Sequence, residues 1–211
     1  FATGHRHYTG EDSAQVTFTA PATYDRLADV GNTFFDTVAT GTGSGATRTW
    51  TFLPSNTADL LKGFTYELGG TNFPSAYTLT GCVGQQLDIG IKPNMPWELK
   101  QTHQGMVTDA ATLTASLSLP SSLGTDDVLW TQTKVYIDST SAYGTTQMVG
   151  RIVSADISLV NGLDPRFTLD GVATPYRVAL SKERDVSATI VAEYDSQTQY
   201  TAWAAGTAQR V

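Results

Sequence analysis

The chain has 211 residues, enough for one sizeable β domain or two small ones. Its formal net charge of −7 argues against a protein that grips nucleic acid, because phosphate binding needs clusters of Lys and Arg. A single cysteine, Cys82, excludes an internal disulfide and a thiolate metal cluster, and no apolar run approaches the roughly 18 residues that span a bilayer.

The composition favours strands over helices. Charged residues make up only 16% of the sequence and hydrophobic residues 40%, so much of the polar surface must come from Thr, Ser, Gln and Gly. Thr and Tyr favour strands, whereas Gly and Pro separate them. The sequence therefore predicts an all-β fold, to which the patterns below add one or two short helices.

The first 14 residues are expected to form an N-terminal arm. They lack hydrophobic periodicity and are rich in Gly, Thr, His and acids, so they would be ordered only against another surface. The start also lacks the apolar segment of a secretory signal peptide. Because no internal repeat or Ser/Pro linker divides residues 15–211, we expect them to form one β-sandwich domain.

The first half of this domain is expected to contain strands and loops. Residues 41–46 are predicted to form a loop, and residues 57–63 a short helical turn ended by glycine. In the longest strand, Gly81 and Gly84 indicate a bulge. Strands are expected over residues 15–21, 47–54, 64–69 and 76–91.

Residues 23–38 have an ambiguous pattern. Their apolar side chains are spaced in a loosely helical way, but Gly31 and Asn32 interrupt the pattern in the middle. We therefore expect a mixed, partly extended segment there.

The second half is expected to continue as strands and to end in a helix. The helix should cover residues 195–206, with Asp195 or Ser196 as its cap and Gly206 as its stop. Residues 110–127 alternate weakly and then become a loop. Strands are expected over residues 96–108, 128–140, 149–162 and 185–195.

Four of the expected strands have one apolar and one polar face, because side chains alternate along a strand. The apolar faces should enter a core. The opposite face is small, hydroxyl-rich and sparsely acidic, whereas an ordinary solvent face carries more Lys and Glu together. The main polar-face candidates are Gln86, Asp88, Glu98, Lys100, Ser154, Asp156, Ser158 and Glu193, accompanied by Thr102, Ser187 and Thr189.

No segment has the pattern of a nucleophilic or nucleotide-binding site. Residues 41–48 are rich in glycine but lack the Gly-Lys-Ser/Thr ending of a phosphate loop, and Ser44 sits in that loop rather than between strand and helix. Cys82 lies in an apolar strand, where a buried inert thiol is expected. His103, at a strand end, is expected to be a surface or interface residue.

Metal and glycosidase sites are also not expected. His5 and His7 could chelate a metal only with a third ligand, and the third histidine of the sequence is far away. Glu67, Glu98 and Glu193 lie on predicted strands, where water-facing carboxylates are the norm. We therefore expect no catalytic residue, no metal and no cofactor.

The tryptophans could in principle form a platform that stacks on sugars. They fall at positions expected to face the core, so core packing is the better interpretation. These residues are Trp50, Trp97, Trp130 and Trp203.

The order of segments resembles the major tail proteins, or tail tube proteins, of long-tailed phages. The first part of the resemblance is carried by RTWTFLPSNTADLLKGFTYELG, then AYTLTGCVGQQLDIGI with PWELKQTHQG. It continues through TKVYIDST to GRIVSADISLVNGLDPRFTLDG and ends with DVSATIVAEYDSQTQYTAWAAG. The resemblance spans about residues 15–211 and rests on segment order, since the family has no invariant catalytic motif.

The resemblance implies a β-sandwich with a flanking helix, a hexameric ring with an inner β-barrel shared between subunits, and rings that stack into a tube. The protein would be a virion component assembled in the host cytoplasm, with tape measure and tail-end proteins as partners. Genomic DNA would pass through the lumen without specific binding. Asp88, Glu98, Asp156 and Glu193 would then face a polyanion, which a hydroxyl-rich, faintly acidic wall repels. Lys100 and Arg151 depart from a uniformly negative lining.

Two other functions remain open. A monomeric β-sandwich adhesin or carbohydrate-binding module would present an exposed aromatic platform. A phage head-decoration or neck protein would share the composition but form trimers or a single ring.

Overall fold

In the part of the chain that the structure describes, one main β-sheet carries two short α-helices, which confirms the all-β prediction. The structure, a computed structural model, describes residues 14–35, 42, 49, 52, 63–69, 76–105, 107–111, 126–139, 144–194, 197–207 and 209–210. Several predictions concern residues outside these ranges. They are the N-terminal arm except Ala14, the loop over 41–46 except Thr42, the turn over 57–63 except Gly63, and the residues His5, His7, Ser44 and Trp50.

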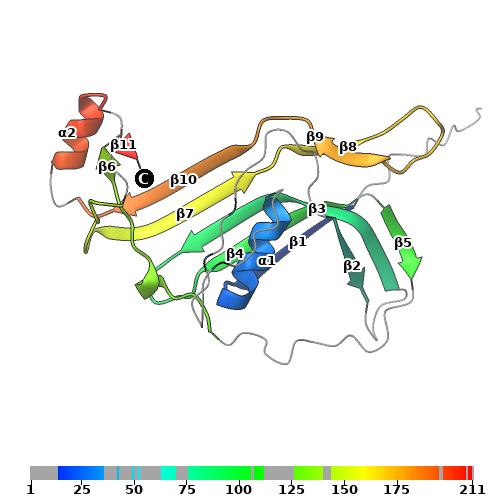
Figure 1. Cartoon of the computed structure of the whole chain (residues 1–211), viewed down its shortest axis with the longest axis horizontal. Coiled ribbons are helices and arrows are strands. Elements are labelled where there is room, and N and C mark those ends of the chain that lie inside the picture. Colours follow the sequence, from blue (N-terminus) through cyan, green and yellow to red (C-terminus); the bar gives the residue numbers. More distant parts are fainter. Residues whose placement is uncertain are drawn as a thin grey trace, which may run out of the picture.

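Seven antiparallel strands build the main sheet. Its order is β1-β4-β3-β7-β10, and β2 and β5 pair with the first half of β3 (Figure 1). The strands are β1 (Ala14–Pro21), β2 (Phe64–Leu68), β3 (Ala76–Ile91), β4 (Glu98–Gly105), β5 (Val107–Ala111), β7 (Ile152–Val160) and β10 (Asp185–Ala192).

The smaller elements lie over one face of the sheet or at its ends. Helix α1 lies across the sheet, whereas α2 stands beside β6 and β11 at the far end of β7 and β10 (Figure 1). Two-stranded ladders join β6 to β11 and β8 to β9. Their bounds are α1 (Tyr24–Phe34), the 3-10 turn η1 (Trp130–Gln132), β6 (Asp138–Ser139), β8 (Leu163–Arg166), β9 (Arg177–Leu180), α2 (Thr198–Ala204) and β11 (Gln209–Arg210).

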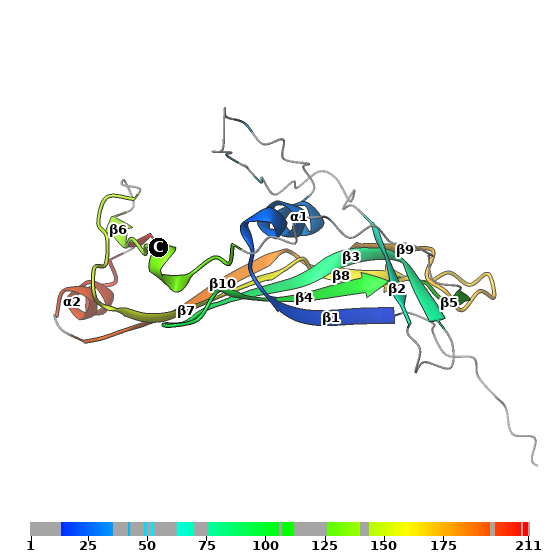
Figure 2. The same cartoon turned by 90° about the horizontal axis from the view of Figure 1, so that it is seen from below.

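Strand β3 is bent where the sequence predicts a bulge. Gly81 has a φ of 63°, a conformation that favours glycine, and the pairing of β3 with β4 shifts register between Gly84 and Gln86. The first half of β3 therefore pairs with β2 and β5, and its second half with β4 and β7. Figure 2 shows β2 and β5 turning away from the long strands.

The prediction of a mixed segment over residues 23–38 is wrong for residues 24–34, which form the 11-residue helix α1. Leu27, Val30 and Phe34 follow one side of this helix and pack on the sheet. Gly31 lies within the helix, where it allows the ring of Phe52 to pack closely. A β-carbon at this position would lie 2.4 Å from that ring. Close packing therefore outweighs the poor helix propensity of glycine.

The core lies between α1 and the apolar face of the sheet. Its buried members include Phe34 of α1 together with Leu87 and Leu99 of the central strands. Buried Asn161 fixes the end of the helix, because its Nδ2 donates to the carbonyls of Phe34 (3.1 Å) and Gly84 (2.8 Å). The described residues contain no second large sheet over this face, so the sandwich arrangement stays a prediction.

The continuous strand predicted over residues 128–140 is wrong. An isolated bridge pairs Leu129 with Pro96, the 3-10 turn follows, and only Asp138 and Ser139 form a short strand. Asp138 instead organises the loop after it: its carboxylate accepts hydrogen bonds from Thr145 and Thr146, chiefly from Thr145, and these hold its pKa at about 2.

The predicted strands over 149–162 and 185–195 are confirmed as β7 and β10, somewhat shorter than expected. The final helix is confirmed as α2, and Gly206, with a φ of 65°, follows its end as predicted. Its N-cap is Gln197 rather than Asp195 or Ser196, so the predicted cap is wrong.

Candidate functional site on the polar face of the sheet

The strand register aligns polar side chains in rows across five strands. One row runs from β1 to β10 through Thr19, Lys100, Asp88, Ser158 and Ser187. The next row runs through Pro21, Glu98, Gly90, Asp156 and Thr189. A third row runs through Thr17, Thr102, Gln86, Val160 and Asp185. We call the surface made by these three rows, with Ser154 and Val191 beside them, the polar face.

Asp88 is the best-anchored carboxylate of this face. Ser158 Oγ donates a 2.6 Å hydrogen bond to Asp88 Oδ1 from the neighbouring strand, and Gln86 Nε2 donates to both carboxylate oxygens at 2.9 and 3.1 Å. Lys100 stands opposite on β4. The side chain is therefore held within the sheet by its neighbours rather than left free.

Asp156 lies beside a glycine that leaves a shallow hollow in the face. A β-carbon added to Gly90 would lie 3.4 Å from Asp156 Oδ1. Glu98, Lys100 and Thr189 complete the surroundings of this hollow. With Asp88 and Asp185, the three rows carry four carboxylates against the single ammonium of Lys100, so the face has an acidic excess.

Seven of the eight main polar-face candidates lie in the three rows or beside them, whereas Glu193 lies beyond the end of β10. Strand β10 ends at Ala192, after a register shift that pairs Val191 with Ser154 and Ala192 with Ile152. Glu193 lies beyond that shift, where its backbone N–H donates to the carbonyl of Arg151. The extra residue of this irregularity lies in β7, between Ile152 and Ser154, and the position of Glu193 on the polar face stays a prediction.

Two valines of the polar face are not among the residues that the sequence predicts there. Val160 stands opposite Gln86, and Val191, 48% exposed, stands opposite Ser154. Val191 was detectable, because it is two residues beyond Thr189 on the same strand. The face is thus hydroxyl-rich and acidic but not uniformly polar.

His103 is buried, so the prediction of a surface or interface residue is wrong. Its ring is 1% exposed and is surrounded by the rings of Phe18, Phe34 and Tyr66, at centroid distances of 5.3 to 5.6 Å. Neither ring nitrogen has a hydrogen-bond partner, and burial lowers the pKa of the imidazole to about 4. His103 belongs to the face opposite the acidic rows, under α1.

Cys82 is buried, as the sequence predicts. Its thiol contacts the carbonyl of Leu79 at 3.6 Å, and burial raises its pKa. A buried protonated thiol is a poor nucleophile. Within the described residues, no group of three or more His, Cys, Asp or Glu side chains is arranged to hold a metal ion.

The tryptophans differ from the prediction of core packing. Trp97 is partly buried and its indole N–H donates to Thr133 Oγ1 at 2.8 Å, whereas Trp130 is 40% exposed. Trp203 of α2 is 75% exposed, so core packing is wrong for it. Its ring lies 5.8 Å from that of exposed Tyr200, one helical turn before it.

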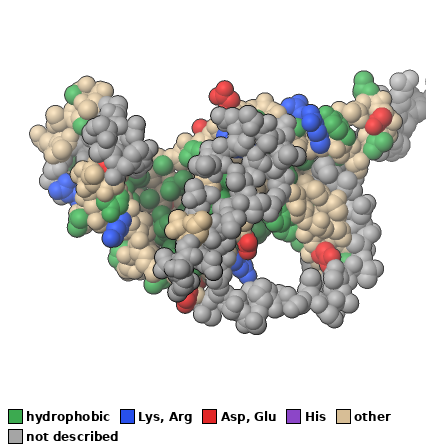
Figure 3. Space-filling model, in the orientation of Figure 1, with side chains coloured by type: hydrophobic (Ala, Val, Ile, Leu, Met, Phe, Trp, Pro, Cys, Tyr) green, Lys and Arg blue, Asp and Glu red, His purple; other side chains and the backbone are tan. Residues whose placement is uncertain are grey.

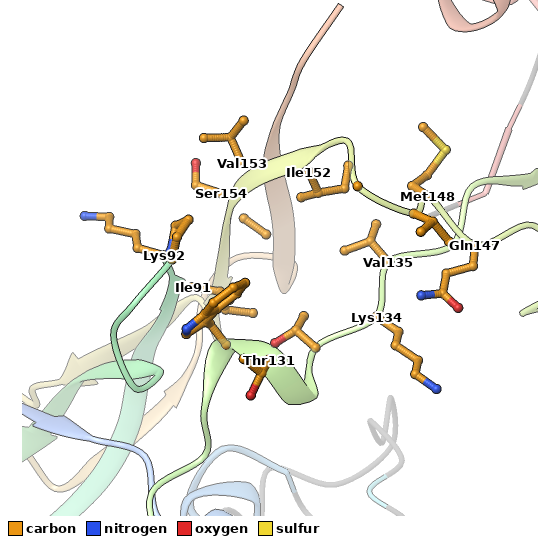
Figure 4. Close-up of a pocket in the computed structure, with 16 residues that line it drawn as sticks. Ile91, Lys92, Thr131, Lys134, Val135, Gln147, Met148, Ile152, Val153 and Ser154 are labelled. Atoms are coloured by element: carbon orange, nitrogen blue, oxygen red, sulfur yellow. The ribbon is translucent and has the colours of Figure 1, made fainter. Parts of the chain in front are cut away.

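A cleft opens on the other side of the sheet, near the start of β7. It has a volume of about 230 Å³ and lies between Ile91, Ile152 and the segment around Val135. In Figure 4 the ammonium groups of Lys92 and Lys134 point away from its centre. Hydrophobic side chains also gather between α1 and the β6–α2 end (Figure 3). This cleft offers apolar packing but no converging charged groups.

Comparison with models of known protein families finds no match, and no curated protein matches the sequence. None of the helices in the described residues has the length and apolar character needed to cross a membrane.

Proposed function

We propose that this chain is the major tail tube protein of a long-tailed phage, which forms stacked hexameric rings around a channel for the genome. The observation that carries the proposal is the polar face: five strands present an acidic, hydroxyl-rich surface on one side, while α1 packs on the other. The resemblance in segment order points the same way.

The chemistry of the face suits a conduit rather than a binding site. Duplex DNA carries one negative charge per about 1.7 Å of its axis, so a strongly basic wall would retain it. Asp88, Glu98 and Asp156 repel phosphate, and the hydroxyls of Ser158 and Thr189 keep the wall hydrated. Lys100 lies between carboxylates, which limits its attraction for a passing phosphate.

The size of the sheet suits a ring of six. Six copies of five strands, spaced by about 4.8 Å, would form a closed barrel with a circumference of at least roughly 140 Å. Such a barrel is about 45 Å across its backbone, which leaves a channel once side chains are added. The tape measure protein would occupy this channel before the DNA, and tail-end proteins would cap the tube.

Negative-stain electron microscopy of the purified protein tests the proposal. Long hollow tubes built from stacked rings are expected at high protein concentration. A chain that stays monomeric at the same concentration would rule the proposal out, whereas trimers or isolated rings would favour a head-decoration or neck protein.

One observation favours an alternative function. The exposed rings of Tyr200 and Trp203, on one side of α2, are the kind of surface on which sugars stack. A monomeric adhesin or carbohydrate-binding module would use this pair, and its binding to a glycan array would be lost in Trp203→Ala. A tube protein would show no such binding.

A further inference from the structure

The two edges of the main sheet expose the apolar ends of one row of side chains. On the face under α1, this row runs through Phe18, Gln101, Leu87, Leu159 and Val186 from β1 to β10. Its centre is covered, since Gln101 is 7% and Leu87 6% exposed. Its two ends are open, because Phe18 is 38% and Val186 64% exposed. The row therefore ends at each edge with a partly exposed apolar side chain that has no further strand of the described residues on its outer side.

Within the described residues, both edge strands lack the usual protection against pairing. Edge strands are normally short, charged, bulged or covered. Here β1 and β10 have eight residues each, and their only charged residue is Asp185, the first of β10. Pro21 is only the last residue of β1, and the register shift between β10 and β7 lies at Val191/Ala192, near the end of β10. Among the described residues, no strand pairs with the outer side of β1 or β10.

The two edges also run in the same direction. Each of the four contacts in the order β1-β4-β3-β7-β10 is antiparallel, so the direction reverses four times between the first strand and the last. A rotation about an axis along the strands preserves strand direction. Copies related by such a rotation therefore bring β10 of one to β1 of the next as parallel strands.

We infer that β10 of one copy pairs in parallel with β1 of the next copy, which makes this the contact that closes the ring. The inference rests on the proposed function and specifies the surface used for it. The pairing gives Val186 and Phe18 new apolar neighbours, and it continues the acidic rows from Ser187 and Thr189 onto Thr17 and Thr19. Each copy contributes both edges, so the contact is heterologous and repeats around the ring.

A two-fold contact is the competing geometry. Two β1 strands, or two β10 strands, related by a two-fold axis would pair antiparallel and would stop after two copies. Such a dimer leaves the other edge of each copy open. The strand direction across the contact therefore separates the two geometries.

Pairs of engineered cysteines measure that direction. One cysteine replaces Gln15, Thr17, Thr19 or Pro21 on β1, and the other replaces Asp185, Ser187, Thr189 or Val191 on β10. These positions all point to the polar face and are exposed. A disulfide forms only when the two β-carbons come within about 4.5 Å, so the pairs that link report the register. Native Cys82 is buried and serves as the unlinked background.

If the strands pair in parallel, the residue numbers of the linked cysteines increase together along β1 and β10. If Thr17→Cys links to Ser187→Cys, for example, then Thr19→Cys links to Thr189→Cys. Non-reducing gels should show ladders up to the hexamer from that series alone. The matched control, Ser158→Cys with Thr19→Cys, should give no ladder, because Ser158 is on a central strand. Circular dichroism confirms that each variant folds.

Three patterns of cross-linking would overturn the inference. The first is a series in which the residue number on β10 falls as that on β1 rises, which is antiparallel pairing. The second is a link in a variant with a single engineered cysteine. The third is a set of rings, seen by microscopy, in which no cysteine of β1 links to one of β10. The last of these leaves the ring proposal intact and removes only the assigned strands. Absence of any assembly removes both, whereas parallel links in a chain that forms no tubes would retain the contact and reject the tube.

A charge placed on the edge gives a second measurement. Ser187→Lys puts a lysine on β10, and Ser154→Lys puts the same charge on the same face of a central strand. Ser187→Lys should raise the concentration needed for assembly at least tenfold, and Ser154→Lys should change it less than threefold. Equal effects of the two variants would contradict edge pairing.

Discussion

Ser158 Oγ donates a 2.6 Å hydrogen bond to Asp88 Oδ1 across the two central strands of the sheet. This bond fixes one carboxylate of the polar face from the neighbouring strand. Replacing Ser158 with Ala should lower the free energy of unfolding by about 1 kcal/mol, because a partly buried bond to a charged acceptor is lost. Urea denaturation measures this, with Ser154→Ala as a control that should cost less than about 0.5 kcal/mol. Equal losses would show that the bond adds nothing.

The close contact between α1 and the bend of β3 gives a prediction about packing. A β-carbon at Gly84 would lie 2.9 Å from both the ring of Phe34 and the carbonyl oxygen of Thr33. Gly84→Ala should therefore destabilise the protein by about 1–3 kcal/mol. Gly90→Ala is the matched control, because its nearest neighbour would be 3.4 Å away, and it should cost less than about 1 kcal/mol. Thermal unfolding of the two variants should separate them.

Buried His103 predicts a loss of stability in acid. Its folded-state pKa is about 4, below the ordinary value of 6.5, so the unfolded chain binds the proton more readily. The histidine contribution is complete above pH 6.5 and is lost as the pH falls towards 4, by on the order of 3 kcal/mol at most. Tyr66 and Cys82, which lie in the same region, have raised pKa values and do not titrate there.

The measurement for His103 compares urea midpoints at pH 7 and pH 4.5. The wild type should lose more stability between these pH values than His103→Phe. This variant keeps an aromatic ring among those of Phe18, Phe34 and Tyr66 but has no imidazole to titrate. The histidines at positions 5 and 7 are common to both proteins and cancel in the comparison. Identical losses in the two proteins would mean that His103 is not protonated on unfolding in this range.

The sequence predicts the polar face better than the elements that flank it. Alternation alone identifies the shared face of β3, β4, β7 and β10, because these strands are long and regular. It does not find the register shift between β7 and β10, where β7 has one extra residue between Ile152 and Ser154, because no residue type marks it. It also fails for α1, where Gly31 is a packing residue rather than a helix breaker.

Burial that depends on the tertiary structure could not be predicted. His103 is covered by α1, β1 and β2, which are distant in sequence, so its position near a strand end gave the wrong expectation. The position of Trp203 in the predicted last helix indicates core packing, yet α2 leaves this side chain exposed. The strand expected over 128–140 follows its β-branched and aromatic residues, whereas Val128 is held by backbone bonds to Ala22 and Trp97.

The charge of the polar face predicts the behaviour of DNA towards assembled tubes. Asp88→Lys with Asp156→Lys should convert a wall that repels DNA into one that binds it. The control Asp170→Lys with Glu183→Lys makes the same charge change at exposed positions off this face. Fluorescence anisotropy of a labelled duplex should show binding to the first variant, weakening steeply with salt, and little binding to the control. Equal binding of DNA to both variants would show that the binding does not depend on the polar face.

The central claim is that the polar face lines a channel, and a cryo-electron microscopy map of the assembled protein tests it most directly. The account predicts a hollow tube in which the side chains of Asp88 and Asp156 project into the lumen and α1 lies outside the barrel. A tube with these carboxylates on its outer surface or buried between rings would contradict the account.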